Sequence, residues 1–245
     1  MESAESDWRV AVREIRSNED LHRVPAFEQR IWHNPDPIPD SLLRVWSDRG
    51  GAVWVAARED FPDEWVGFAI AFPARDSKGW YLHSDLAGVL APWRSHGIGR
   101  RLKENQRAWA RREGYSRIGW TFDPLRAQNA RFNLQYLQAR VVAYYPDYYG
   151  TMETSLTQGY PTDRLFVEWP VDPTPAPAGG GGEQRIAVPR DIGAIVQVDP
   201  EQARRIQAVV RGQFQRLLAQ GWEVAGFEWS DTPCYVLQRT GAGEG

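Results

Sequence analysis

The sequence has little cysteine, little net charge and no long apolar segment, and each shortage excludes a class of protein. Among 245 residues there is one cysteine, so no disulfide can form within the chain and a reducing compartment fits. A formal net charge of −3 gives no global basic field to attract nucleic acid. No apolar run reaches the roughly 18 residues of a membrane helix, and the acidic first residues do not resemble a signal peptide. We therefore expect a cytoplasmic protein with neither membrane nor nucleic-acid partners.

The single cysteine, Cys234, allows two interpretations. It begins a strand-like run at residues 232–237, where a small buried hydrophobic side chain is the favoured interpretation. A catalytic thiol is the alternative, although no other feature of the sequence supports it.

Hydrophobic periodicity predicts an alternation of strands and helices that continues to about residue 170. Short connections between the second, third and fourth strands favour antiparallel neighbours. The predicted order is a strand at 8–15, helices at 18–31 and 41–46, strands at 52–58, 65–72 and 80–90, a helix at 98–112, a strand at 116–122, a helix at 127–138, and strands at 141–145 and 165–169.

A stretch rich in proline and glycine separates this region from the rest of the chain. Residues 171–184 include four consecutive glycines, and their composition is typical of a flexible linker. We therefore predict a first domain at 1–170, the linker at 171–184, and a C-terminal β-α-β-β extension at 185–245. In the helix of this extension, Arg204 and Arg211 share one face. They could bind an anionic group or the other domain, although a surface position is the favoured interpretation.

The strongest chemical signal is the segment Arg94-Ser95-His96-Gly97-Ile98-Gly99, which follows a strand and opens a helix. Glycines at 97 and 99 allow the backbone to approach a ligand that a Cβ would exclude. The amino end of the helix presents unpaired N–H groups and a positive dipole end, which suit a pyrophosphate. Nearby Arg100, Arg101 and Lys103 add positive charge.

Arg94, Gly97 and Gly99 match the pattern Gln/Arg-x-x-Gly-x-Gly/Ala, and this segment resembles the acyl-CoA signature of the GNAT acetyltransferase superfamily. The order of predicted elements over about residues 8–170 is also similar to that superfamily. The stretches 120–125, 129–134 and 148–150 look like a subgroup of predicted GNAT proteins. The resemblance implies an α/β (α+β) fold, with a mixed, mostly antiparallel central sheet flanked by helices.

The resemblance also implies an acyl-CoA-dependent N-acyltransferase, with acetyl-CoA or another acyl-CoA as cosubstrate, an amine as acceptor and no metal. The pantetheine arm would lie where the strands ending near Leu90 and Phe122 part, paired with the backbone of Val89 and Leu90. A backbone N–H near Leu90 would stabilise the oxyanion. The cofactor-binding residues implied are Val89, Leu90, Arg94, Ser95, His96, Gly97, Ile98, Gly99, Arg100, Arg101, Asn129 and Asn133.

A base must deprotonate the amine before it attacks, and two residues of the preceding strand are candidates. Strand alternation predicts that His83 and Asp85 share a face with Ala87 and Val89. Asp123 is a third candidate. The competing interpretation makes His83 a half-buried strand residue and Asp85 an ordinary charge at a sheet edge.

The leaving thiolate needs a proton, which a tyrosine in the late helix supplies in many members of the superfamily. The corresponding position here holds Leu134, so Tyr149 is our candidate, with Tyr144, Tyr145 and Tyr148 as alternatives. This departure keeps open a non-catalytic acyl-CoA-binding module. A homodimer and the identity of the acceptor stay open as well.

Overall fold

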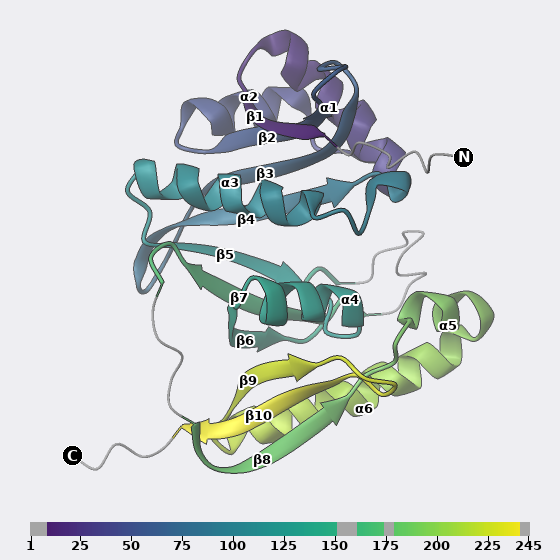
Figure 1. The fold of residues 1–245 in the computed structure, drawn as a ribbon. Helices are drawn as coiled ribbons and strands as arrows, with labels where there is room; N and C mark the ends of the chain where they lie inside the picture. The colour runs from purple at the N-terminus through teal and green to yellow at the C-terminus, as the bar shows by residue number, and fades with distance from the viewer. Residues whose placement is uncertain (1–8, 151–160, 174–178, 241–245) are drawn as a thin grey trace, which may run out of the picture. The chain divides into compact units, whose positions relative to one another are not determined.

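The computed structural model describes residues 9–150, 161–173 and 179–240. The chain divides into two compact units, Met1–Ile118 and Gly119–Gly245 (Figure 1). The first unit contains β1 (Val10–Ile15), α1 (Asn18–Trp32), α2 (Asp40–Asp48), β2 (Ala52–Arg58), β3 (Trp65–Asp76), β4 (Gly79–Val89), the 3-10 turn η1 (Ala91–Trp93) and α3 (Ile98–Arg112). The strand β5 (Arg117–Phe122) begins in the first unit and continues into the second.

The strands of the first unit form a sheet in the order β1-β2-β3-β4, with every neighbouring pair antiparallel. The central strand β2 is buried almost throughout because helices cover both of its faces. Val53 and Val55 belong to the core beneath α1 and α2. Trp54 points the other way and meets Trp109 of α3 edge-on, with 5.5 Å between ring centroids.

The helix α1 forms where the sequence places a cap and an apolar stripe. Its first turn is closed by Ser17, whose side chain accepts a hydrogen bond from the Asp20 N–H at 3.0 Å. The apolar residues of the predicted helix all lie inside this unit's core. Phe27 meets both Trp65 and Phe68 edge-on at 5.8 Å. The buried apolar residues of α1 are Leu21, Val24, Phe27 and Ile31.

The helix α3 covers the opposite face of the same sheet (Figure 1). Leu102 and Trp109 are buried, as the apolar spacing predicted. The contact is close: a Cβ built on Gly67 of β3 would lie 3.3 Å from Leu102 Cδ1. The sheet with α1 and α2 on one face and α3 on the other therefore forms one packed layer system.

The second unit contains a further antiparallel strand pair and a small separate sheet. β6 pairs with β7, and the small sheet has the antiparallel order β8-β10-β9. The unit's elements are α4 (Ala127–Ala130), the π-helix η2 (Arg131–Tyr136), β6 (Arg140–Tyr145), β7 (Arg164–Pro170), β8 (Gly179–Ala187), α5 (Ile192–Val198), α6 (Pro200–Ala219), β9 (Trp222–Glu228) and β10 (Cys234–Thr240).

Two predictions about this unit were wrong in detail. The single helix predicted at 127–138 is the four-residue α4 followed by a π-helix, in which the Leu137 N–H donates to Phe132 O, five residues back. The β-α-β-β prediction for the C-terminal extension also missed the helix α5, which is present in the structure. The Asp191 side chain caps α5 by accepting a hydrogen bond from the Ala194 N–H. At seven residues, α5 is too short for periodicity to detect.

The glycines of the predicted linker fall within β8, where residues 179–180 pair with β10. The boundary between domains stays a prediction, as does the gap between β4 and β5. Cys234 is 6% exposed in β10, as expected for a small buried side chain. The predicted fold class, mixed α/β with mostly antiparallel strands flanked by helices, is confirmed. In the described part of the chain, no helix has the length and apolar character needed to cross a bilayer.

Arg204 and Arg211, predicted to share an exposed face, have different environments. Arg211 forms a two-point ion pair with Asp163, at 3.0 Å from Nε and 2.5 Å from Nη2, and the Asp163 side chain is 1% exposed. Asp163 also accepts hydrogen bonds from the Tyr144 hydroxyl and the Asp147 N–H. Arg204 is at the surface and pairs with Glu201. The surface prediction is therefore confirmed for Arg204, whereas Arg211 is partly buried, with 30% of its side chain exposed.

Candidate functional site

The connection between β4 and α3 carries the glycine-containing segment identified in the sequence. Ser95 and Gly97 both adopt positive φ angles, 67° and 75°. Glycine adopts such a φ without strain, whereas most other residues do so at a cost. A Cβ built on Gly97 would meet no atom within 4 Å, so the space in front of this position is open.

The amino end of α3 lies at this open position. Gly97 is the N-cap, supplies no side-chain hydrogen bond, and the first turn holds no acidic residue. The first bond of the helix runs from the Arg101 N–H to Gly97 O at 3.0 Å. The N–H groups of Ile98, Gly99 and Arg100 therefore lack carbonyl partners within the helix. Together with the helix dipole they can hold an anionic group such as a diphosphate.

The side chains around this helix end are exposed and mostly basic. Arg94 donates from Nε to the carbonyl of Val89 at 3.0 Å, which uses one of its five N–H donors. Arg100 pairs with Glu104 at 2.7 Å one turn along the helix. The side chains of Ser95, His96 and Arg101 are exposed.

Lys103 does not contribute to this charge, contrary to the sequence-based expectation. Its side chain is 4% exposed and Nζ donates to Ser84 Oγ at 2.6 Å, with Gln106 Oε1 at 3.5 Å. Burial lowers the pKa of Lys103 to about 7. The residue thus anchors α3 to β4 at a distance along the helix from its amino end.

The backbone at the end of β4 shows which N–H near Leu90 is available as the predicted oxyanion donor. The Leu90 N–H donates to Val66 O at 2.9 Å and so belongs to the ladder with β3. Val89, the residue before Leu90, lies opposite Gly67. In an antiparallel ladder, hydrogen-bonded and non-hydrogen-bonded pairs alternate, so the N–H and C=O of Val89 are directed away from β3. At this end of β4 the N–H that points away from β3 is therefore that of Val89.

A β-bulge changes which residues of β4 share a face. The register with β3 shifts between Ile70 and Ala71, so that Asp85 is an extra residue between Ser84, opposite Ala71, and Leu86, opposite Ile70. Leu86 packs against the core beneath α1 and α2. From Leu86 onward, each side chain of β4 therefore lies on the opposite face of the sheet from the one that strict alternation through Asp85 predicts.

Because of the reversal, the side chains of His83 and Asp85 lie on the opposite face of the sheet from the side chain of Val89. Gly88 faces α1, because a Cβ there would lie 2.7 Å from the Trp32 ring. Val89 faces α3, since its Cγ2 and Leu102 are the side-chain neighbours of a Cβ on Gly67. The prediction that His83 and Asp85 share a face with Ala87 and Val89 was therefore wrong.

His83 lies in an aromatic environment on the face covered by α1 and α2. Its ring is 5.0 Å from that of Phe72 and 6.0 Å from that of Tyr81, and Phe72 is 4.5 Å from Trp46. Burial, and then the charge of Lys103, lower the pKa of His83 to about 4. The imidazole is thus neutral at pH 7 but a weak base.

Asp85 has the properties of a stronger base. Its side chain is partly buried, and among the described residues no group donates a hydrogen bond to its carboxylate. Burial, and then the nearby Glu28 carboxylate, raise the pKa of Asp85 to about 6. The third candidate, Asp123 in the second unit, already accepts from the Leu125 N–H at 2.8 Å.

Sequence reasoning missed Glu28, the buried acid beside Asp85. Glu28 is 2% exposed on α1, and its two carboxylate oxygens each accept a hydrogen bond at 3.0 Å, from Asn34 Nδ2 and from the Ile38 N–H. A signal was present, because Glu28 stands three residues before Ile31 and four after Val24, within the apolar stripe of the helix.

The predicted site residues of the second unit have different surroundings. Asn129 is exposed, whereas Asn133 is 4% exposed and its Oδ1 accepts a hydrogen bond from Trp120 Nε1 at 3.3 Å. Asn133 therefore packs within its own unit, and its role in cofactor binding stays a prediction. Tyr149 is 49% exposed, and its hydroxyl is 3.2 Å from Thr121 Oγ1. Its role as proton donor stays a prediction.

The alternative tyrosines are not equivalent. Burial and the Asp163 carboxylate raise the pKa of Tyr144 far above its usual range, so this phenol is a poor acid. Tyr145 and Tyr148 are partly exposed and pack against each other, with ring centroids 5.2 Å apart.

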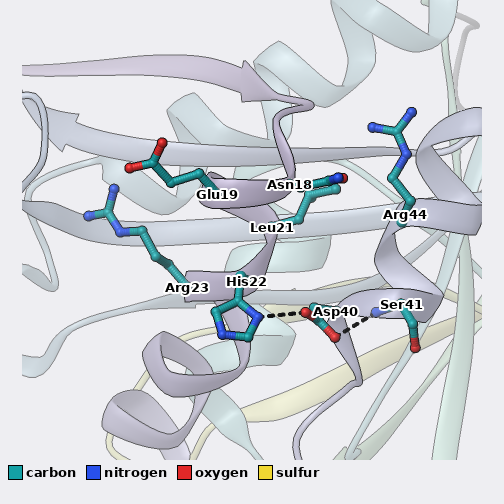
Figure 2. Close-up of a pocket in the computed structure, with 8 residues that line it drawn as sticks. All are labelled: Asn18, Glu19, Leu21, His22, Arg23, Asp40, Ser41 and Arg44. Atoms are coloured by element: carbon teal, nitrogen blue, oxygen red, sulfur yellow. Dashed lines mark hydrogen bonds and ion pairs between the residues drawn. The ribbon is translucent and has the colours of Figure 1, made fainter.

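A hollow of about 710 Å³ lies between the first turns of α1 and α2, and Figure 2 shows the residues that line it. Among the described residues, its lining includes none from β4 or from the β4–α3 connection. Four of its charged side chains, those of His22, Arg23, Asp40 and Arg44, already have partners. His22 pairs with Asp40 at 2.7 Å and Arg44 with Asp48 at 2.5 Å, while Arg23 lies 3.5 Å from Asp20. We assign no ligand to it.

Comparison with known proteins identifies the class of the domain that carries this site. Residues 15–132 match the family model described as the acetyltransferase (GNAT) family. These residues thus form a GNAT acetyltransferase domain, as the sequence resemblance predicted. A comparison with curated proteins gives no match.

Solved acetyltransferases have the same fold. YncA of Salmonella typhimurium, solved with acetyl-CoA, is 19% identical, with a TM-score of 0.53 and coverage of 69% of this chain and 98% of that one. The Escherichia coli ribosomal-protein-S18-alanine N-acetyltransferase is 14% identical, with a TM-score of 0.52 over 68% and 96%. Arabidopsis thaliana Naa50, solved with the bisubstrate analogue CoA-Ac-MVNAL, is 17% identical, with a TM-score of 0.51 over 65% and 97%. At these identities the likeness establishes the fold.

Proposed function

We propose that this protein is an N-acetyltransferase that transfers the acetyl group of acetyl-CoA, or a related acyl group, to an amine. The observation that carries the proposal is the open, uncapped amino end of α3, which follows directly after a strand whose last residue, Val89, directs its N–H away from β3. The N–H groups of residues 98–100 would hold the diphosphate of the cosubstrate, with Arg94 and Arg101 supplying further donors.

The reaction needs no covalent enzyme intermediate. The neutral amine attacks the thioester carbonyl, a C–N bond forms, and the negative charge passes to the carbonyl oxygen. The Val89 N–H stabilises that oxyanion, an interaction typically worth about 3 kcal/mol. Collapse of the tetrahedral intermediate breaks the C–S bond and releases the CoA thiolate. The proton that the attacking nitrogen gives up as the amide forms neutralises this thiolate.

Asp85 would take the proton from the incoming ammonium, directly or through a water molecule. A base works best when it is ionised at the working pH but has a pKa near it. The pKa of about 6 for Asp85 meets this condition better than that of about 4 for His83. We therefore assign the base to Asp85, and we assign His83 to the aromatic packing of its face.

The test is turnover of acetyl-CoA with a panel of amines, namely small metabolite amines, aminoglycosides, peptides with free N-termini and lysine peptides. Thiol release with at least one class, lost in Asp85→Asn, supports the proposal. The alternative is a non-catalytic acyl-CoA-binding module, which the leucine at position 134 favours. Binding of acetyl-CoA without thiol release for any class would establish that alternative.

A further inference from the structure

The solvent-facing side of α3 is strongly basic, although the chain as a whole is not. Five arginines of this helix have exposed or partly exposed side chains, whereas Lys103 is turned into the core. The helix holds one acidic residue, Glu104, and the whole chain has a net charge of −3. We call this surface the arginine face, and its members are Arg100, Arg101, Arg107, Arg111 and Arg112.

The arginine face costs the helix stability unless an anion lies against it. Arg100 pairs with Glu104 at 2.7 Å, but among the described residues Arg101 and Arg112 have no ion pair. Arg100 and Arg101 also stand in the first turn, at the positive end of the helix dipole, where a cation is unfavourable. The helix packs through its other side, so its packing does not require these charges.

The arginine face begins at the site proposed for the phosphate groups of the donor. Arg101 directly follows the open N–H groups of residues 98–100. From there Arg101, Asn105, Ala108 and Arg112 are exposed and are spaced four, three and four apart, so they form one row along the helix. At 1.5 Å per residue the row is about 16 Å long. The two residues between its arginines are small and uncharged.

The chemistry of acyl thioesters supplies a ligand that fits both the phosphate site and the row. A pantetheine arm ends in a phosphate whether it belongs to coenzyme A or is attached to a protein. In coenzyme A this phosphate continues into a nucleotide, whereas on a carrier protein it is esterified to a side-chain hydroxyl. A carrier whose phosphate lies at the amino end of α3 therefore has its protein surface beside the residues that surround that end. Arginines there favour a carrier with an acidic surface.

We propose that an acidic carrier protein with a phosphopantetheine arm is an acyl donor for this enzyme, and that it docks on the arginine face of α3. The inference rests on the proposed acyltransferase function. The step is the same as with acetyl-CoA: the amine nitrogen forms the C–N bond and the C–S bond breaks. The carrier thiolate then takes up the proton that the nitrogen gives up. Acetyl-CoA, which has no protein body, uses the phosphate site without the rest of the face.

Nucleic acid is the other polyanion that arginines attract, and the arginine face suits it less well. Proteins that bind single strands combine basic residues with aromatic side chains on which bases stack. The aromatic residue of α3, Trp109, is 2% exposed and packs edge-on against Trp54. The exposed side of the helix therefore offers charge without a stacking surface.

The first measurement compares three donors with one amine at about 0.15 M salt. The donors are acetyl-CoA, free acetyl-phosphopantetheine, and the same acetylated arm on a purified acyl carrier protein. The free arm and the carrier present the same thioester and the same phosphate, so a difference between them reports the carrier's protein surface. We expect kcat/KM for the carrier to exceed that for the free arm by about tenfold or more. Equal or lower values for the carrier would overturn the inference.

Two substitutions at one exposed position test the arginine face without removing a hydrogen bond or an ion pair. Ala108→Glu places an acid in the middle of the row and should lower kcat/KM for the carrier by about fivefold or more. Ala108→Lys should raise it by about twofold or more. Position 108 is about 15 Å from Ile98, beyond the Debye length of about 8 Å, so kcat/KM for acetyl-CoA should change by less than about twofold.

The control places the same acid on the other side of the sheet. Val45 of α2 is 53% exposed, and α2 and α3 cover opposite faces of the sheet. Val45→Glu should leave kcat/KM for both donors unchanged. A loss of carrier turnover in Val45→Glu as large as that in Ala108→Glu would count against a docking surface on α3.

Binding measurements distinguish failure of this inference from failure of the proposed function. Calorimetric titration of the phosphopantetheine-bearing carrier, without an acyl group, requires no turnover. Absence of thiol release from every donor, with carrier binding that Ala108→Glu weakens, would contradict the proposed function and support the docking surface. Turnover of acetyl-CoA without carrier binding would overturn the inference. Binding of a single-stranded RNA that Ala108→Glu weakens, again without carrier binding, would also overturn it, because the arginine face would then be a nucleic-acid surface.

Discussion

Replacing Asp85 by asparagine should stabilise the protein at neutral pH while it abolishes acyl transfer. The folded protein raises the pKa of this carboxyl from 3.8 to about 6, through burial and then the charge of Glu28. At about 1.4 kcal/mol per pH unit, ionising Asp85 in the folded state costs about 3 kcal/mol more than in the unfolded chain. Asparagine has nearly the same shape and carries no charge, so it avoids that cost.

The sign and the pH window follow from proton linkage. Between about pH 3.8 and pH 6 the folded state holds the proton on Asp85 more tightly than the unfolded state does. The free energy of unfolding of the wild type therefore falls, relative to that of Asp85→Asn, as the pH rises through this window. The advantage of the variant is complete above about pH 6 and small near pH 4.

The assay is urea unfolding of both proteins at pH 4.5 and 7.5, followed by tryptophan fluorescence. We expect the variant to be more stable by about 3 kcal/mol at pH 7.5 and by much less at pH 4.5. Asp36→Asn, at an exposed position on the α1–α2 connection, is the control and should change stability little at either pH. A variant that is less stable than the wild type at pH 7.5 would refute the reasoning.

Three further variants test the remaining assignments. His83→Phe should keep kcat within a few-fold of the wild-type value, as turnover will show. Because burial depresses the pKa of His83, the wild type should lose stability relative to this variant as the pH falls from 6.5 towards 4, which urea unfolding measures. Because burial lowers the pKa of Lys103, the free energy of unfolding of the wild type should rise with pH from about 7 to 10.5. Lys103→Met should flatten this rise, and urea unfolding across that pH range is the measurement. Arg211→Met should lower the free energy of unfolding by about 3 kcal/mol, because it leaves the buried Asp163 without its cation. Arg204→Met on the same helix should lower it by less than about 1 kcal/mol, because its ion pair with Glu201 is exposed. Equal losses of stability in thermal unfolding would contradict the difference in burial between the two ion pairs.

The parts of the site that local sequence encodes were predictable. A strand, two glycines and a helix start follow one another within a few residues at positions 89–99, so their chemistry depends on backbone geometry that the sequence itself carries. Likewise, the apolar spacing on α1 and α3 identified residues that are buried in the structure.

The parts that depend on a distant partner were not predictable. The bulge at Asp85 exists only in the pairing of β4 with β3, and one extra residue reverses the facing of everything after it. The burial of Lys103 depends on Ser84, which is 19 residues away in the chain. The π-helix at Arg131–Tyr136 was also missed, because its period differs too little from that of an α-helix to appear in six residues.

The most direct measurement is calorimetric titration of acetyl-CoA into Gly97→Val and Gly114→Val. Both glycines have positive φ angles, 75° and 82°, at opposite ends of α3, and a Cβ at either would meet no protein atom within 4 Å. Both variants therefore carry a similar backbone strain, but only valine at 97 would occupy the position proposed for the diphosphate. We predict a loss of affinity of at least about tenfold for Gly97→Val and near wild-type binding for Gly114→Val. Equal affinities for the two variants would contradict the account.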